Sequence, residues 1–332
     1  MRNLKHLLSI FLITSLAVGI NSCSGLDADS SNGDNTGDGP SFGGGANSGS
    51  GDAIAQGQTL LGLFNELISQ QGANVPRQKI YLVAHRASTH SGRVLGCPDN
   101  SIPAIKKAIE VGADMLELDV RTTSDGKLIL MHDESINATT NGSGYVSKMT
   151  LEQIRSYDME RNGTVYKENG QSVKVPTLEE ALQACKGKVY VNLDLKDVVS
   201  PSKLVRTIAD AGMQGQVMLY CSGADAIEYQ YKDQTIAVHP FIGSAGGVDQ
   251  YASCPGAKLF QYDISVWYSG QTLAKEVRAK GYLTYSNILD YDSQIFNGNY
   301  SALDKFIASE TDFCQTDHCE VIHEYLKNKG LR

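Results

Sequence analysis

The sequence lacks several features that would point to common classes of protein. Its 29 Lys and Arg against 37 Asp and Glu leave a formal net charge of -8, which argues against a protein that mainly neutralises nucleic-acid phosphates. No apolar run is long enough to cross a membrane as a helix. No CxxC pair occurs, so a zinc ribbon has little support. No glycine-rich dinucleotide or P-loop fingerprint follows a predicted strand. With 41% hydrophobic residues, the chain is able to build a substantial core.

The first 22 residues resemble a secretory signal peptide. Arg2 and Lys5 precede an apolar run over 7–20, which is too short for a membrane span but suits an exported protein. The run ends before Cys23 in a pattern similar to bacterial lipoprotein signals, in which cleavage leaves a lipid-modified Cys. We therefore predict a signal over 1–22 and a lipid anchor at Cys23 that holds the protein to a bacterial membrane, on its periplasmic or cell-surface side. A plain signal peptide with an incidental Cys is the alternative.

Glycine is concentrated in one segment of the chain. Nine of the 33 glycines lie between Ser24 and Asp52, together with five Asp and no Lys or Arg. Such a segment buries too little apolar surface to fold, so we predict a disordered tether over 23–52 and a folded domain over 53–332. Asp52 is the predicted cap of an N-terminal helix that ends near Gly72. Its apolar residues fall at helical spacing: Leu60, Leu61, Phe64, Leu67 and Ile68.

The chain has seven cysteines, and the sequence does not settle their use. Apart from Cys23 there are six cysteines, an even number that is compatible with disulfides in an oxidising compartment. Their spacing does not indicate which of them would pair. They are Cys97, Cys185, Cys221, Cys254, Cys314 and Cys319.

Beyond Pro76, short apolar runs alternate with helical stretches. The helix over 100–112 has Asn100 or Ser101 as its cap and Gly112 as its stop. Repeated βα units favour a parallel sheet covered by helices, and eight or nine strands over about 250 residues fit a (β/α)8 TIM barrel better than an open sheet. One strand candidate must be surplus. The candidates are Ile80–Ala84, Met115–Val120, Leu128–Met131, Val189–Leu195, Val217–Tyr220, Ile236–Val238, Leu259–Tyr262, Tyr282–Tyr285 and a weaker Phe313–Thr316 before a last helix over about 319–329.

Charged residues follow or end several of these strands. Glu117 and Asp119 are two residues apart, so on a strand both side chains point the same way. If Leu116 and Leu118 face the helices, both carboxylates face the barrel axis near its C-terminal mouth. Two adjacent anions need a counter-charge, and a hard divalent cation with oxygen ligands supplies it. Asp194 on a neighbouring strand would complete a site of three carboxylates.

Each of these residues has an ordinary structural interpretation when it is taken alone. A Glu-x-Asp pair often marks the solvent face of an edge strand. The dipeptides His85-Arg86 and His132-Asp133 are individually typical of satisfied structural histidines, and Lys196 alone would be a surface side chain. Their joint placement at successive strand ends favours a catalytic site instead.

These strand ends resemble the glycerophosphodiester phosphodiesterase family. That family has a His-Arg-Gly strand end, a Glu-Asn-Thr helix start, a Glu-x-Asp strand, a His-Asp strand end, a Thr-Thr-Asn-Gly loop and a later Glu-x-Lys strand. The resemblance spans about Lys79 to Gly330, is densest from His85 to Gly142, and includes a closing Thr316-Asp317. The corresponding residues are His85-Arg86-Ala87, Asp99-Asn100-Ser101, Glu117-Leu118-Asp119, His132-Asp133, Thr139-Thr140-Asn141-Gly142 and Asp194-Leu195-Lys196.

The sequence also departs from the family pattern. Ala87 replaces the usual Gly, Asp99 and Ser101 alter the Glu-Asn-Thr element, and Asp194 is one methylene shorter than the usual Glu ligand. The pair of histidines and the first two carboxylates are kept, so the departures concern the choice of metal and the substrate pocket. Two further differences are Ala138 in place of an Arg, and Thr284-Tyr285-Ser286-Asn287 in place of Trp-Thr-Val-Asn.

The resemblance implies a (β/α)8 barrel and a metal-dependent phosphoric diester hydrolase. Its substrates would be glycerophosphodiesters, which it would cleave to an alcohol and sn-glycerol 3-phosphate. His85 and His132 would be general acid and base, with the assignment between them open. Glu117, Asp119 and Asp194 would bind one divalent cation, Ca²⁺ or Mg²⁺. A cyclic phosphate forms first if a substrate hydroxyl attacks, and the monoester forms directly if water attacks.

Substrate contacts are less defined by the sequence. Arg86 and Lys196 would add positive charge at the phosphate. Trp267, with Tyr262 and Tyr285, would form an aromatic wall for a head group or would belong to barrel packing. No nucleic-acid or protein partner is predicted. The alternatives are another phosphodiester such as a glycerophosphoinositol or a lysophospholipid, a non-catalytic surface lipoprotein that binds a ligand, and a metal-dependent sugar isomerase or aldolase barrel.

Overall fold

The computed structural model describes residues 51–71, 79–263 and 272–332. The chain divides into two compact units, Met1–Ser41 and Phe42–Arg332, and every described residue belongs to the second. The predicted signal peptide, Cys23, most of the predicted tether and Trp267 lie outside the described residues. Within the described ranges, no helix has the length and apolar character needed to cross a membrane.

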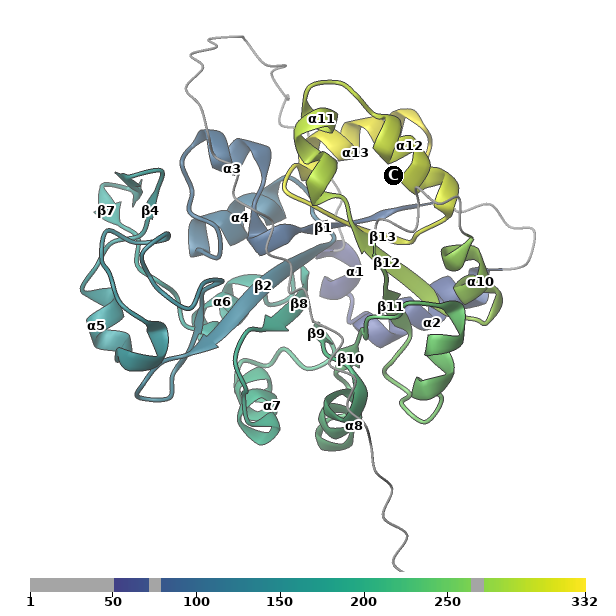
Figure 1. Cartoon of the computed structure of the whole chain (residues 1–332), viewed down its shortest axis with the longest axis horizontal. Helices are drawn as coiled ribbons and strands as arrows, with labels where there is room; N and C mark the ends of the chain where they lie inside the picture. The colour runs from purple at the N-terminus through teal and green to yellow at the C-terminus, as the bar shows by residue number, and fades with distance from the viewer. Residues whose placement is uncertain (1–50, 72–78, 264–271) are drawn as a thin grey trace, which may run out of the picture. The chain divides into compact units, whose positions relative to one another are not determined.

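Eight parallel strands form a nearly closed barrel (Figure 1), which confirms the predicted (β/α)8 architecture. Their order around the barrel is β10-β9-β8-β2-β1-β13-β12-β11. Isolated parallel bridges, Val238 to Ala257 and Phe241 to Gln261, join the two ends of this order. The strands are β1 (Tyr81–Ala84), β2 (Met115–Thr122), β8 (Tyr190–Leu195), β9 (Val217–Tyr220), β10 (Ala237–Val238), β11 (Leu259–Gln261), β12 (Leu283–Asn287) and β13 (Phe313–Thr316).

The ninth strand candidate is β3 (Leu128–Leu130), which pairs antiparallel with β2 and lies off the barrel order. Only the short connection 123–127 separates the two strands. A parallel partner would need a crossover of a dozen or more residues, so a connection of this length permits only a hairpin. The surplus candidate is therefore the one that follows β2.

Helices surround the strands, and apolar side chains fill the layer between them. Leu116 and Leu118 of β2 pack in this layer with Ile105 and Leu182 from two of the helices. Ser101, not Asn100, caps the first of these helices, because its hydroxyl accepts a hydrogen bond from Ala104 N. The surrounding helices are α4 (Ile102–Glu110), α6 (Leu178–Cys185), α7 (Pro201–Asp210), α8 (Gly223–Lys232), α10 (Leu273–Ala279), α12 (Ser301–Ser309) and α13 (Cys319–Asn328).

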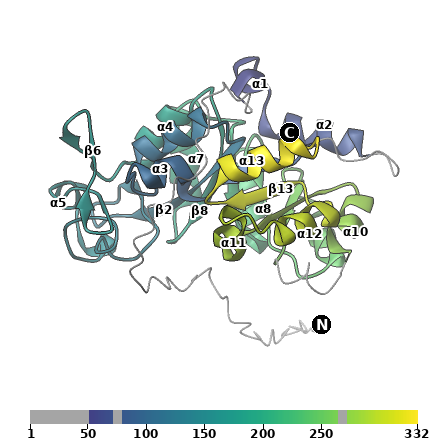
Figure 2. The same cartoon turned by 90° about the horizontal axis from the view of Figure 1, so that it is seen from above.

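Two N-terminal helices, α1 (Gly51–Ala55) and α2 (Leu60–Gln70), pack on the barrel. The sequence placed a single cap at Asp52, which is wrong for α2: Thr59 Oγ1 accepts a hydrogen bond from Gly62 N and starts that helix. Phe64 is fully buried against inward-facing strand residues such as Phe313. Figure 2 shows α1 and α2 on the side opposite α11 (Asp292–Phe296), which follows a strand end. The helix pair therefore covers the N-terminal end of the barrel.

A large insertion, 131–176, separates β3 from α6. It has a small hydrophobic cluster of its own, which includes Ile136, Val146 and Met159. Gly142 is required in it, because a Cβ there would lie 2.3 Å from the Tyr157 ring. Its elements are η2 (Val146–Lys148), α5 (Leu151–Arg155), β4 (Glu160–Arg161), β5 (Thr164–Val165), β6 (Lys167–Glu168) and β7 (Gln171–Ser172).

The remaining short elements lie in connections between strands and helices. They are η1 (His85–Ala87), α3 (His90–Val94), η3 (Ala245–Tyr251) and η4 (Leu289–Tyr291). All six cysteines beyond Cys23 are free thiols. No disulfide therefore joins any of them in the structure.

Candidate active site

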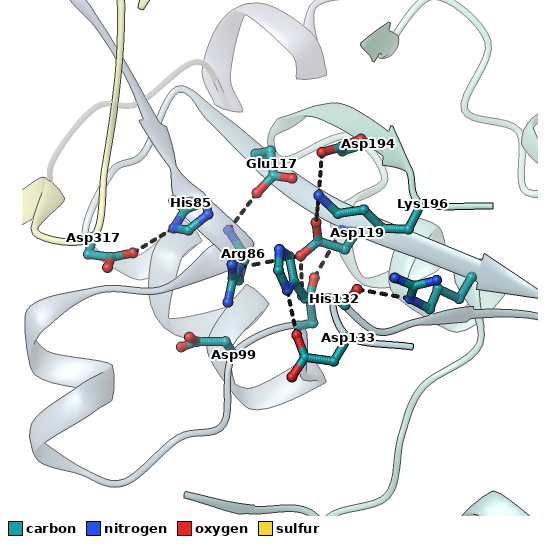
Figure 3. Close-up of polar contacts among 12 residues, drawn as sticks. His85, Arg86, Asp99, Glu117, Asp119, His132, Asp133, Asp194, Lys196 and Asp317 are labelled. Atoms are coloured by element: carbon teal, nitrogen blue, oxygen red, sulfur yellow. Dashed lines mark hydrogen bonds and ion pairs between the residues drawn. The ribbon is translucent and has the colours of Figure 1, made fainter. Parts of the chain in front are cut away.

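Three carboxylates meet at the C-terminal end of β2 and β8. Glu117 and Asp119 lie on β2, and Asp119 pairs in register with Asp194 on β8. One oxygen of each carboxylate lies within 4.8 Å of the others. Glu117 and Asp119 are 4% and 1% exposed, so the strand alternation does turn them into the barrel, as the sequence predicts. Figure 3 shows the three side chains converging.

The charges around these carboxylates are only partly balanced. Burial, followed by the negative charges of Asp119 and Asp194, raises the pKa of Glu117 to about 8. Burial would also raise the pKa of Asp119, but Lys196 and Arg86 outweigh it and hold that pKa below its usual value. Lys196 Nζ lies 2.6 Å from Asp194 Oδ2 and 3.1 Å from Asp119 Oδ1. One lysine thus bridges two of the three acids.

Asn100 holds Asp119 in place, a role that the sequence did not reveal. Its side-chain amide donates to Asp119 Oδ2 at 2.7 Å, and its oxygen accepts from Asp119 N at 3.1 Å. Asn100 has a φ of 56°, in the left-handed region that asparagine tolerates better than most residues. Because Ser101 is the helix cap, the Asn100 side chain is free to turn toward the strand.

The donor set fits a divalent cation with oxygen ligands. Asp119 Oδ1 is buried, and Lys196, whose Nζ lies 3.1 Å from it, is shared with Asp194. A buried, incompletely paired anion is costly. The group formed by Glu117, Asp119 and Asp194 therefore could bind a metal ion.

His85 follows β1 directly and faces this group. Its Nδ1 lies 3.0 Å from Asp317 Oδ1 at the end of β13. Burial favours the neutral imidazole, but the hydrogen bond and charge of Asp317 outweigh it and raise the pKa of His85. Arg86 N donates to Glu117 Oε2 at 2.9 Å, which ties this turn to the carboxylates. Arg86 and Ala87 both have positive φ, 52° and 56°. Ala87 stands where the family usually has Gly, so a residue with a side chain adopts a backbone conformation in which strain is expected.

Asp317 is itself fixed from several sides. Arg93 Nη2 lies 2.5 Å from its Oδ2. The buried carboxylate of Asp292 accepts hydrogen bonds from Asp317 N and Thr316 Oγ1, both at 2.6 Å. From the sequence, Asp317 is only part of a closing motif; the structure makes it a site residue. Its contact with His85 spans 232 positions, so no local spacing could indicate it.

Replacing Asp317 by Asn tests its role as a positioning residue for His85. We expect kcat to fall about 10- to 100-fold, because the imidazole loses the partner that fixes its tautomer and orientation. Asp317 raises the pKa of His85, so the limb of the kcat–pH profile that reports His85 should move to lower pH. A kcat–pH profile measured from pH 5 to 9 checks both effects. An unchanged profile would show that Asp317 does not act on His85.

His132 faces the same site from the insertion that follows β3. Its Nδ1 lies 2.7 Å from Asp133 Oδ1, and burial lowers its pKa. Arg121 Nε donates to the His132 carbonyl at 2.8 Å, while Arg121 Nη1 lies 2.7 Å from Asp197. The two histidines are thus each paired with a carboxylate, and both approach the group of three acids (Figure 3).

The predicted aromatic wall is not seen among the described residues. Tyr262 and Tyr285 are 1% and 0% exposed, and the Tyr285 hydroxyl donates to Gln315 inside the barrel. They belong to barrel packing, which was one of the two interpretations of the sequence. The third member of the proposed wall, Trp267, lies outside the described residues.

A model of the glycerophosphoryl diester phosphodiesterase family matches residues 85–295, a range that holds both histidines and all three carboxylates. The chain belongs to this family. It is 35% identical over 147 residues to the glycerophosphodiester phosphodiesterase of Caldanaerobacter subterraneus subsp. tengcongensis, which is 42% of this chain and 57% of that protein. It is 38% identical over 110 residues to Homo sapiens glycerophosphodiester phosphodiesterase 1, which is 33% of this chain and 31% of that protein. The aligned parts thus span less than two thirds of these relatives.

Solved structures of family members have the same fold. A crystal structure of a glycerophosphoryl diester phosphodiesterase from Parabacteroides distasonis superimposes with a TM-score of 0.65 at 22% identity, covering 80% of this chain and 92% of its own. An Oleispira antarctica phosphodiesterase in complex with the product sn-glycerol-3-phosphate gives 0.58 at 18% identity, covering 74% and 96%. At these identities the likeness concerns the barrel and not the details of the site.

Proposed function

We propose that this protein hydrolyses glycerophosphodiesters to an alcohol and sn-glycerol 3-phosphate. The observation that carries the proposal is the pair of carboxylate-bound histidines, His85 and His132, facing three clustered carboxylates, two of them buried, at the C-terminal end of the barrel strands. In phosphodiester hydrolysis an oxygen attacks phosphorus and the bond to the leaving alcohol breaks. One proton must leave the attacking oxygen and one must reach the leaving oxygen. Two imidazoles are suited to divide these transfers.

The three carboxylates Glu117, Asp119 and Asp194 would hold one divalent cation, Ca²⁺ or Mg²⁺. When bound, it would supply positive charge to the non-bridging phosphate oxygens. Arg86 and Lys196 add the chain's own positive charge beside the same carboxylates. The site therefore combines proton transfer with neutralisation of the phosphate.

The carboxylate partners of the histidines fix where each proton resides. When its Nδ1 is protonated, His85 donates a hydrogen bond to Asp317. His132 donates one to Asp133 in the same way. Each ring then presents Nε2 as the atom that takes or gives a proton at the substrate. Which histidine serves the attacking oxygen is left to experiment.

A panel of diesters tests the proposed function. The substrates are glycerophosphocholine, glycerophosphoethanolamine, glycerophosphoglycerol, glycerophosphoinositol and a lysophospholipid, each with Ca²⁺ and with Mg²⁺. We expect phosphomonoester release from the glycerophosphodiesters, measured by a coupled assay for sn-glycerol 3-phosphate. A folded protein that releases a monoester from none of them would favour a non-catalytic ligand-binding barrel and reject the proposal.

From the sequence of residues 1–52 we further propose export and lipid anchoring at Cys23. The basic start, the short apolar run and the Gly/Ser/Asp-rich segment support it. Mass spectrometry of the mature chain should find an N-terminal Cys23 carrying two or three acyl chains. An unmodified N-terminus at another residue would contradict this proposal.

A further inference from the structure

Arg93 contacts the carboxylate partner of His85 from a different segment of the chain. It belongs to α3, in the connection that follows β1, and its Nη2 lies 2.5 Å from Asp317 Oδ2. His85 Nδ1 lies 3.0 Å from the other oxygen of that carboxylate, Oδ1. The Arg93 Nε also donates to Oγ of the buried Ser88 at 2.6 Å. The guanidinium is therefore held both by Ser88 and by the acid that contacts His85.

The helix that carries Arg93 is fixed to the segment that carries Asp317. The Glu320 side chain, on α13, accepts hydrogen bonds from His90 N at 3.1 Å and from Ser91 N at 3.0 Å, at the start of α3. Glu320 is 7% exposed and lies shortly after Asp317 in the chain. These contacts hold α3 near the end of β13 without using the Arg93 side chain. A change at Arg93 should therefore leave the two segments in place.

The charge of Arg93 acts on Asp317 together with that of His85. Burial would raise the pKa of Asp317, but the hydrogen bond and charge of His85, followed by the charge of Arg93, hold that pKa below its usual value. An ionised Asp317 can only accept hydrogen bonds, so it favours the tautomer of His85 in which Nδ1 carries the proton. Arg93 thus stabilises the state of Asp317 that orients the imidazole.

A second acid, Asp99, also contacts Arg93. Its Oδ2 lies 3.7 Å from Arg93 Nη2, and its Oδ1 accepts a hydrogen bond from Arg161 Nη1 at 2.7 Å. Arg161 lies on β4, in the insertion that follows β3. Asp99 is the residue that stands where the family usually has Glu. Charges of alternating sign thus run from Arg161 through Asp99 and Arg93 to Asp317.

We propose that Arg93 is a positioning residue for His85. It holds the Asp317 carboxylate in the orientation that accepts a hydrogen bond from His85 Nδ1, which leaves His85 Nε2 for the substrate. Arg93 itself does not contact the substrate in this proposal. The proposal rests on the proposed function for the catalytic role of His85.

A double-mutant cycle with the full chain tests whether Arg93 acts through Asp317. For Arg93→Gln we expect kcat for glycerophosphoglycerol to fall about 3- to 30-fold with KM changed less than about twofold, because the residue orients a group and does not bind the diester. In the Asp317→Asn background the same change should lower kcat by less than about twofold further, because the carboxylate that it orients is absent. Losses that multiply in the double variant, or an unchanged kcat in Arg93→Gln, would overturn the proposal. Arg93→Lys serves for the same cycle if Arg93→Gln does not fold.

A measurement that does not depend on turnover separates this proposal from the proposed function. Long-range ¹H–¹⁵N NMR spectra at alkaline pH report the tautomer of His85, whose signals are identified by their loss in His85→Ala. We expect the proton on Nδ1 in the unaltered protein and a mixture of both tautomers in Arg93→Gln. Arg206→Gln, at an exposed residue of α7, should change neither kcat nor the spectrum. If no diester is hydrolysed, a changed tautomer in Arg93→Gln still supports the proposal, and an unchanged tautomer overturns it.

Discussion

Replacing His85 or His132 by Ala is expected to lower kcat by about two to four orders of magnitude, the usual size of general acid–base assistance. Each imidazole is paired with a carboxylate through Nδ1, at 3.0 Å for Asp317 and 2.7 Å for Asp133. That pairing leaves the opposite nitrogen for the substrate. The measurement is steady-state hydrolysis of glycerophosphoglycerol, with circular dichroism to show that the variants fold.

A third histidine provides the matched control. His323 lies on α13, and its Nδ1 accepts a hydrogen bond from Arg332 at 3.2 Å, a side chain that also contacts Asp114, just before the N-terminal end of β2. His323→Ala should keep kcat within about threefold of the unaltered protein, since loss of a buried side chain that touches no residue of the candidate site acts mainly on stability. Near-normal turnover in both His85→Ala and His132→Ala would show that these histidines are not the general acid and base.

Removing divalent cations is expected to abolish hydrolysis, and adding Ca²⁺ or Mg²⁺ is expected to restore it. Glu117, Asp119 and Asp194 bring three carboxylates within 4.8 Å, and Lys196 alone bridges two of them. Without a cation the site would repel a phosphodiester, which is itself an anion. Activity should be measured after dialysis against a chelator, and again after titration with each cation.

A second readout separates metal binding from catalysis. A ligand that binds only the folded state raises the melting temperature, so Ca²⁺ or Mg²⁺ should raise it in the unaltered protein. Asp194→Asn should reduce this shift, because it removes one carboxylate and leaves its position in β8 unchanged. A control variant, Asp210→Asn on the exposed end of α7, should show the full shift. Full activity after exhaustive chelation would reject the metal site.

The fold was largely predictable, because each strand carries its own apolar signal. Each of the eight barrel strands overlaps a predicted apolar run, although β2 and β12 extend two residues beyond theirs, and Leu116 and Leu118 face the helices as the alternation requires. Pairing direction is not encoded in an apolar run, so β3 was indistinguishable from a barrel strand by composition. The short connection between β2 and β3 is the feature of the sequence that indicates an antiparallel hairpin. The start of α2 was misplaced because one helix was predicted from Asp52 to near Gly72, whereas Asp52 lies inside the separate helix α1 and Thr59 caps α2.

The candidate site was predictable where its residues share a strand or end one. Glu117 and Asp119 follow from period-two alternation, and Asp194 follows from the same rule on the neighbouring strand. Asn100 and Asp317 did not follow, because their roles depend on contacts between distant segments. Such contacts leave no periodic trace in a single sequence.

The most direct test of the account is a ³¹P NMR time course of glycerophosphoglycerol with the full chain and Ca²⁺ or Mg²⁺. We expect the diester signal to be replaced by that of sn-glycerol 3-phosphate, and this conversion to stop when a chelator is added. A transient signal of a cyclic phosphate would indicate attack by a substrate hydroxyl, and its absence would favour attack by water. A diester signal that stays unchanged with folded, metal-supplied protein, whatever the diester, would contradict the account.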